Sequence, residues 1–349
     1  MEVGGFPSLS DGGAGMAVKR IPVIVLTGFL GSGKTTLLRA LLESGSVADT
    51  AVLVNEYGAV GLDHTLMWRA GEVVQVVENG CICCSVSDDL IAMLVELFEL
   101  RLYRKVPKFQ RVVIETTGLA DPRSIMQALR AHPLVNERFR LAAVLCTVDA
   151  TASAASVLRA PEGTPQIAAA DRILLTKTDL VDRDCIDAWS AALSRANPAA
   201  ELSCIRADAF PAGLAGFFEE IPGASLGQRC RENAVAWSLP RSLARSARHS
   251  EVCTATIHLP QSVDEMALYQ ALDELTARFE DRLLRLKGIV RLSGKPQPSV
   301  VQAVRSQIFP LESIADFDGP GFLVVILRGN VDDAEWATAL LTRCCSGLR

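Results

Sequence analysis

Runs of apolar residues alternate with amphipathic stretches along the first part of the 349-residue chain. The runs are rich in Val, Ile and Leu, which predicts buried strands of a parallel sheet with helices on both faces. The predicted strands are Ile21–Thr27, Thr50–Val54, Val73–Val77, Arg111–Ile114, Leu141–Val148 and Arg172–Leu175. Helices are predicted over Lys34–Glu43 and over Asp88–Arg104, with Ser87 as the cap of the second. This alternation predicts an α/β domain, doubly wound around a mainly parallel sheet.

The pattern changes after about Phe210. Pro211–Gln228 contains Pro and Gly turns, and Arg229–Arg248 is basic and rich in Ser, which is typical of a linker. A smaller α+β unit follows, with strands Val252–Leu259, Leu284–Leu292, Ser299–Ile308 and Gly321–Leu327 and helices Val263–Phe279 and Asp332–Cys344. We therefore expect a flexible tail over 1–20, an α/β domain over 21–228, a linker over 229–250 and a second domain over 251–349.

The net charge, the apolar runs and the N-terminal residues argue against several classes of protein. The net charge of −5 and the pI of about 5.5 argue against a partner that is a nucleic acid or an anionic membrane, because either would need a basic face. No apolar run approaches the roughly 20 residues that span a bilayer. Residues 1–20 lack the pattern of a secretory signal, so the ten cysteines are expected to be thiols or metal ligands in the cytoplasm.

A complete phosphate-binding loop joins the first predicted strand to the first predicted helix. It runs Gly28-Phe-Leu-Gly-Ser-Gly-Lys-Thr35. Its glycines let successive backbone N–H groups turn toward phosphate oxygens, and the helix N-terminus adds a partial positive charge. Lys34 is expected to reach the β- and γ-phosphates, and Thr35 to ligate Mg²⁺. The alternative is a chance glycine turn, and the strand before it and the helix after it argue against that.

Two further motifs concern the nucleotide. Glu115-Thr-Thr-Gly118 ends a predicted strand, so its carboxylate is placed to hold Mg²⁺ and the Gly118 N–H to sense a γ-phosphate. In Thr176-Lys-Thr-Asp179, Asp179 can accept two hydrogen bonds from guanine that adenine does not offer, and the stem of Lys177 can cover the base. The usual residue at Thr176 is Asn, whose amide ties the loop together, so weaker guanine selectivity is expected. The alternative is that Lys177 and Asp179 are ordinary surface residues that do not contact a base.

A cluster of three cysteines is the candidate metal site. Cys81 and Cys84 have the C-x-x-C spacing, and Cys83 supplies a third sulfur. Three thiolates favour Zn²⁺ or another thiophilic metal such as Co²⁺ over Mg²⁺ or Ca²⁺. A fourth protein ligand is not obvious, which fits an open site that can release its ion, and Glu56 and His64 are the candidates to complete it. A redox dithiol and buried inert cysteines are the alternatives.

Together these motifs resemble the CobW-type family of metal-chaperone GTPases, which includes zinc-regulated GTPase metalloprotein activators. The resemblance is carried by Gly28–Leu38, Asn55–Gly58, Asn79–Cys84, Glu115–Pro122 and Thr176–Asp179, with a looser match around Leu284–Ile289. It implies a P-loop GTPase domain followed by the family's C-terminal domain. It also implies nucleotide contacts from Gly28, Gly31, Ser32, Gly33, Lys34, Thr35, Thr36, Gly118, Thr176, Lys177 and Asp179, and metal contacts from Cys81, Cys83, Cys84, Thr35, Glu115 and Glu56.

The resemblance implies a protein that binds Mg-GTP and a transition metal (zinc, cobalt or iron) and delivers the metal to a client metalloprotein or a cofactor-biosynthesis enzyme on hydrolysis. Lys34 and Glu115 are the expected catalytic residues. No catalytic glutamine or arginine finger can be assigned, so slow intrinsic hydrolysis is expected. A metal- or redox-sensing GTP-binding protein without turnover and a small-molecule kinase are the alternatives. A homodimer that depends on metal and GTP is left open.

Overall fold

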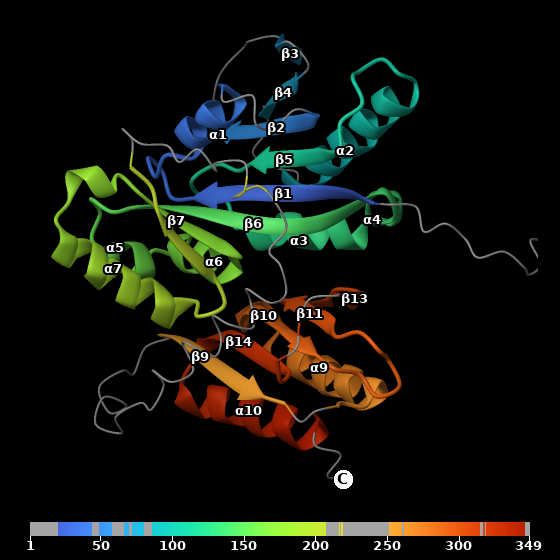
Figure 1. Cartoon of the computed structure of the whole chain (residues 1–349), viewed down its shortest axis with the longest axis vertical. Coiled ribbons are helices and arrows are strands. Elements are labelled where there is room, and N and C mark those ends of the chain that lie inside the picture. The colour runs from blue at the N-terminus through green and yellow to red at the C-terminus, as the bar shows by residue number, and fades with distance from the viewer. Residues whose placement is uncertain are drawn as a thin grey trace, which may run out of the picture.

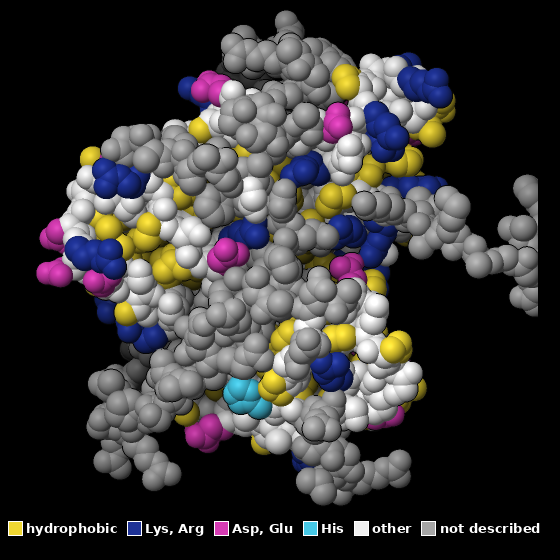
Figure 2. Space-filling view, in the orientation of Figure 1, with side chains coloured by type: hydrophobic (Ala, Val, Ile, Leu, Met, Phe, Trp, Pro, Cys, Tyr) yellow, Lys and Arg dark blue, Asp and Glu magenta, His cyan; other side chains and the backbone are white. Residues whose placement is uncertain are grey.

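The protein, described here by a computed structural model, has two domains in contact (Figure 1). The structure describes residues 20–43, 49–57, 66–69, 72–79, 86–206, 216, 218, 251–259, 262–314, 317 and 319–345. Within these ranges, no helix is long and apolar enough to cross a membrane. Basic and acidic side chains are interspersed on the face shown in Figure 2.

The first domain alternates strands and helices. Its elements are β1 (Ile21–Gly28), α1 (Lys34–Glu43), β2 (Thr50–Tyr57), β3 (Leu66–Arg69), β4 (Glu72–Asn79), α2 (Val86–Leu102), β5 (Arg111–Glu115), α3 (Pro122–Ala131), α4 (Pro133–Arg138), β6 (Phe139–Asp149), α5 (Ala154–Arg159), α6 (Gly163–Ala169), β7 (Arg172–Thr176), the 3-10 helix η1 (Thr178–Leu180), α7 (Arg183–Ala196) and β8 (Glu201–Cys204). The described strands form one sheet in the order β3-β4-β2-β5-β1-β6-β7-β8. Neighbouring strands are parallel except for the antiparallel pair β3 and β4.

Helices cover both faces of this sheet, which confirms the doubly wound prediction. Val23 and Val25 of β1 pack in a core with residues of α2 and α3, whereas Ile24 and Leu26 pack with α1 on the opposite face. Since both faces of the strand are buried, an apolar residue is favoured at every one of these positions. The carboxyl ends of the parallel strands meet at one edge, where the loops after β1, β5 and β7 begin.

The second domain confirms the predicted α+β unit. It comprises β9 (Glu251–His258), α9 (Glu265–Phe279), the 3-10 helix η3 (Glu280–Arg282), β10 (Leu283–Val290), β11 (Ser299–Val304), β12 (Gln307–Ile308), β13 (Glu312–Ser313), β14 (Phe322–Gly329) and α10 (Val331–Cys345). Its described strands are ordered β12-β11-β10-β14-β9, with β13 paired to β11, and all these pairs are antiparallel. Helices α9 and α10 cover one face (Figure 1).

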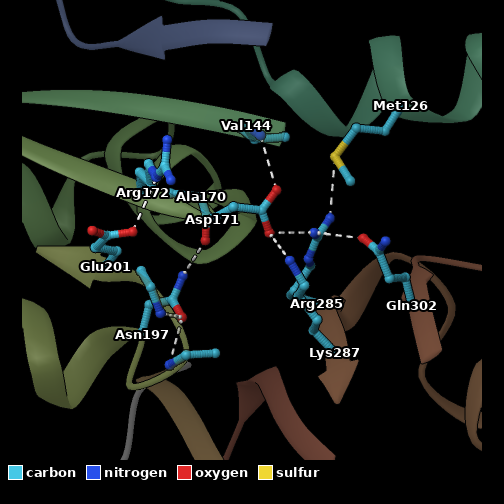
Figure 3. A network of polar contacts seen from close by, with 12 residues as sticks. Met126, Val144, Ala170, Asp171, Arg172, Asn197, Glu201, Arg285, Lys287 and Gln302 are labelled. Atoms are coloured by element: carbon cyan, nitrogen blue, oxygen red, sulfur yellow. Dashed lines mark hydrogen bonds and ion pairs between the residues drawn. The ribbon is translucent and has the colours of Figure 1, made fainter. Parts of the chain in front are cut away.

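The other face of the second sheet packs against the first domain. On β14, Leu323 and Val325 belong to the core shared with α9 and α10, whereas Phe322, Val324 and Ile326 pack with Ala168 of α6. A polar network lies in the same interface, centred on Asp171, which is just past α6 (Figure 3). Its carboxylate accepts hydrogen bonds from Arg285 and Lys287 of β10 and from the backbone of Val144.

Two local predictions were wrong. Helix α2 begins at Val86, so Ser87 lies in its first turn and not at the cap position. The predicted strand Ser299–Ile308 is a hairpin of β11 and β12 that turns at Arg305, whose φ of 52° is in the left-handed region. A turn at a residue other than Gly, Asn or Asp gives little sequence signal. The short helices α3 to α6 were not predicted.

Candidate functional site

The phosphate-binding loop has the backbone that the sequence predicted. Gly28, Gly31 and Gly33 have φ values of 140°, 72° and 94°, which side-chain-bearing residues rarely adopt. At Gly28 a Cβ atom would lie 2.4 Å from the backbone oxygen of Thr147 on the neighbouring strand β6. Ser32 Oγ hydrogen-bonds with Thr147 Oγ1 at 2.7 Å. The loop is therefore fixed against β6 in a conformation that requires glycine.

Lys34 and Thr35 are the last two residues of the loop and the first two of α1. The Lys34 ammonium is buried and donates to the carbonyl oxygens of Gly28 and Phe29 at 2.8 and 3.0 Å. Thr35 Oγ1 donates to Glu115 Oε1 at 2.6 Å. The structure thus brings together the two predicted Mg²⁺ ligands, from the start of α1 and the end of β5, and oxygen donors of this kind suit Mg²⁺. Thr36, in the first turn of α1, is exposed.

The predicted sensing residue Gly118 lies against the phosphate-binding loop. A Cβ atom there would lie 2.6 Å from the backbone nitrogen of Leu30, so only glycine allows this approach. The carbonyl oxygen of Gly118 accepts a hydrogen bond from Gln166 Nε2 of α6 at 3.1 Å. The sequence analysis missed Gln166, although a polar residue in the apolar stretch before β7 was a signal.

The predicted guanine-recognition loop, Thr176–Asp179, is tied to the phosphate-binding loop by Thr176. Its hydroxyl donates to the carbonyl oxygens of Ser32 and Val148 at 2.8 and 3.1 Å. The Thr176 hydroxyl thus ties this loop to the phosphate-binding loop and to β6, in the place of the Asn amide that the sequence analysis found missing. The weaker guanine selectivity stays a prediction. Asp179 lies in η1 and is half-buried.

Lys177 is held by Asp149, which the sequence analysis also missed. Lys177 has a left-handed backbone, with φ of 56°, and its ammonium lies 2.5 Å from Asp149 Oδ2 at the end of β6. Burial by itself raises the pKa of Asp149, but the hydrogen bonds from Lys177 and Thr151 and the charge of Lys177 outweigh it, so the pKa is lowered. An acid that ends an apolar strand, as Glu115 does, was the available signal.

The thiolate cluster of Cys81, Cys83 and Cys84 lies outside the described residues, as do His64 and the side chain of Glu56. Within the part of the chain that the structure describes, no group of three or more His, Cys, Asp or Glu side chains could hold a metal ion. Cys146, beside the phosphate-binding loop, is buried, and that burial raises its pKa to about 12. Such a thiol is protonated at neutral pH and is a poor metal ligand.

Replacing Thr176 with valine should weaken nucleotide binding about five- to tenfold. The variant keeps the shape of the side chain but leaves two buried carbonyl oxygens without this donor, at about 1 kcal/mol or somewhat more. Titration calorimetry with GDP measures the change. The matched control is Thr178→Val, because the buried Thr178 hydroxyl donates at 3.1 Å to Ile205 and not to the phosphate-binding loop. Equal losses in the two variants would contradict the prediction.

The fold and site define a P-loop nucleotide-binding protein with an attached α+β domain. Residues 22–203 match the family described as CobW/HypB/UreG, nucleotide-binding domain, and residues 252–345 match the cobalamin synthesis protein cobW C-terminal domain. The chain belongs to this family. These matches confirm the resemblance seen in the sequence.

Several known proteins are similar over most of the chain. The zinc chaperone YjiA of Escherichia coli is 33% identical over 82% of this chain and 86% of its own length. The zinc chaperone CobW of Pseudomonas aeruginosa is 29% identical over 93% of this chain and 91% of its own. The crystal structure of Zn(II)-bound YjiA GTPase from E. coli superimposes with a TM-score of 0.67 and 26% identity, covering 95% of this chain and 99% of that one.

Proposed function

We propose that this protein is a GTP-dependent metal chaperone. It binds a transition metal at Cys81, Cys83 and Cys84, binds Mg-GTP in the first domain, and transfers the metal to a client metalloprotein or cofactor-biosynthesis enzyme when GTP is hydrolysed. The names of the relatives, two of them zinc chaperones, favour Zn²⁺ as the cargo. Cobalt and iron are the other candidates, because three thiolates bind several thiophilic ions.

The hydrogen bond between Thr35 and Glu115 carries the nucleotide half of this proposal. The 2.6 Å distance between this P-loop hydroxyl and the buried carboxylate supports a Mg²⁺ ion held by both. Bound Mg²⁺ would neutralise charge on the β- and γ-phosphates. Lys34 would leave the carbonyl oxygens of Gly28 and Phe29 to contact those phosphates. Hydrolysis is expected to be slow without a client, since the sequence motifs assign no catalytic glutamine or arginine finger.

The two ligands are proposed to be linked. Strand β4 ends at Asn79, two residues before Cys81 in the sequence. Since β4 and β5 are both parallel to β2, the carboxyl end of β4 lies at the same edge of the sheet as Glu115, the last residue of β5. If Mg-GTP orders the loops at this edge, it raises metal affinity, and reciprocity requires the metal to tighten GTP binding by the same factor. Loss of the γ-phosphate would reverse the effect and release the metal.

Metal affinity measured in the presence of Mg-GTP, of Mg-GDP and of no nucleotide tests this linkage. Competition with a chromophoric chelator gives the Zn²⁺ and Co²⁺ affinities, and bound Co²⁺ also reports thiolate ligation through its charge-transfer band. We expect at least about fivefold tighter binding with Mg-GTP than with Mg-GDP. Cys83→Ala should abolish the band. Cys204→Ala is the control, since Cys204 is an exposed thiol on the edge strand β8.

A metal affinity that is the same with Mg-GTP, with Mg-GDP and without nucleotide would refute gated metal carriage, in which the bound nucleotide controls metal binding and release. It would favour the alternative, a metal- or redox-sensing protein that uses GTP as a structural ligand. Release of phosphate over many turnovers separates these two functions, because only the chaperone must hydrolyse GTP in each cycle. A homodimer that depends on metal and GTP is a separate part of the proposal, and light scattering with both ligands present tests it.

A further inference from the structure

The segment from Gly118 to Asp121 leads from the sensing residue to helix α3 and is held from two sides. From the first domain, Gln166 Nε2 donates to the carbonyl oxygens of Gly118 and Ala120, both at 3.1 Å. Gln166 is buried. Two anchored carbonyls in three residues fix the peptide planes of this segment.

Asp121 is the second anchor and caps the N-terminus of α3. Its side chain accepts a hydrogen bond from the backbone nitrogen of Arg123 at 3.0 Å and pairs with the guanidinium of Arg123 at 2.7 Å. The second domain reaches the same carboxylate, because Arg305 Nη2 lies 3.0 Å from Asp121 Oδ2. The residue that begins α3 is thus bound by a cation from another domain.

Arg305 is placed for this contact by a tight turn. It joins β11 to β12 in a left-handed conformation, and its backbone nitrogen donates to Leu283 at 3.0 Å. Its guanidinium also donates to Gln127 Oε1 on the next turn of α3 at 3.1 Å. The planar group therefore spans two positions of the helix, which one point charge could not do. A strained turn beside a contact of this kind is often kept for function.

We propose that Arg305 is a positioning residue for the nucleotide-sensing segment, so that the C-terminal domain takes part in discriminating GTP from GDP. The inference rests on the proposed role of the Gly118 N–H as the contact to the γ-phosphate. Only the triphosphate makes that contact, so displacement of the segment weakens GTP binding and leaves GDP binding unchanged. By reciprocity, a ligand of the C-terminal domain that moves Arg305 alters GTP affinity.

Arg305→Gly tests the inference against a matched control. Glycine accepts the left-handed backbone without strain, so the substitution removes the Arg305 side chain, with its contacts to Asp121, Gln127 and Asp281, and leaves the turn in place. The control is Arg20→Gly, since Arg20 also bridges the domains, through a 3.0 Å ion pair to Glu312, but stands at the opposite end of β1 from the phosphate-binding loop. Its exposure of 27% is close to the 25% of Arg305.

The measurement is the affinity of each variant for Mg-GDP and for a Mg-bound non-hydrolysable GTP analogue. Arg305→Gly should lower the preference for the triphosphate at least about fivefold, while Arg20→Gly should leave it within about twofold of the wild type. Arg305→Lys keeps the positive charge but loses the planar guanidinium that reaches two acceptors. Its preference for the triphosphate should lie between those of Arg305→Gly and the wild type. A merely structural role would lower thermal stability without changing the ratio of the two affinities.

Two results would overturn the inference. One is an unchanged ratio in folded Arg305→Gly and Arg305→Lys. The other is an equal fall in Arg20→Gly, which would indicate general loosening of the domain interface. Wild-type protein that binds both nucleotides equally would refute the sensing role of Gly118 and this inference with it. Metal affinity that is indifferent to nucleotide would refute gated metal carriage alone.

Discussion

Asp171→Asn is expected to lower the free energy of unfolding by about 3–5 kcal/mol. The Asp171 side chain is 2% exposed, and its Oδ1 accepts from Arg285 Nη2 at 2.9 Å and from Lys287 Nζ at 2.6 Å (Figure 3). The neutral side chain keeps the volume but removes the negative charge that faces the buried guanidinium of Arg285 and the largely buried ammonium of Lys287. The carboxylate then no longer offsets the cost of desolvating these two cations. Urea denaturation at neutral pH measures the loss.

The control for this variant is Asp187→Asn. Asp187 pairs with Arg183 on the surface of α7, where the two side chains are 61% and 83% exposed, so a change within about 0.5 kcal/mol is expected. An equal loss in both variants would contradict the assignment of the cost to burial. So would a loss below about 1 kcal/mol in Asp171→Asn.

The contribution of Asp171 should depend on pH in a defined direction. Burial alone raises the pKa of Asp171, but the charges of Lys287 and Arg285 and the hydrogen bonds outweigh it, so the pKa is lowered in the folded protein. The stabilisation is therefore fully present above the unfolded pKa of about 3.9 and is lost as pH falls through the folded pKa. The difference in stability between wild type and Asp171→Asn should be constant from neutral pH to about pH 5 and shrink below it.

Asp179→Asn is expected to reduce GTP affinity at least about 100-fold. In its predicted role the Asp179 carboxylate accepts two hydrogen bonds from guanine, whereas the amide of asparagine can accept one and presents a donor to the other guanine donor. Xanthine carries an oxygen where guanine carries the exocyclic amine, so the variant should gain affinity for xanthosine triphosphate. Titration of both nucleotides into wild type and variant measures the exchange of preference.

Asp182→Asn is the control for that exchange. This substitution removes one negative charge, as Asp179→Asn does, three residues further along the chain. The Asp182 side chain caps α7, because it accepts a hydrogen bond from the backbone nitrogen of Cys185 at 2.8 Å. Nucleotide preference should stay as in the wild type. If Asp179→Asn weakens both nucleotides equally, Asp179 supports the loop and does not contact the base.

Most elements of the fold were predictable because their signals are local. The strand β1 and the helix α1 were found within one residue of their bounds, since a buried β-branched run and a glycine loop mark them. The short helix α6 was not predicted, because all seven of its residues are buried and it shows no amphipathic periodicity. Its C-terminal carbonyls accept from the side chain of Asn197, a residue from the end of α7.

The sequence by itself determined which short motifs the chain carries, and from them predicted the nucleotide site and the thiolate site. The phosphate-binding loop, the guanine-recognition loop and the three cysteines each occupy a few consecutive residues, so covalent connection already sets their spacing. Only the tertiary structure decided which distant groups join them. Thr176 meets Ser32 across 144 residues, and Arg305 meets Asp121 across 184. Such pairs depend on the order of strands in the sheet and on the docking of two domains, and neither is encoded in a local pattern of apolar and polar residues.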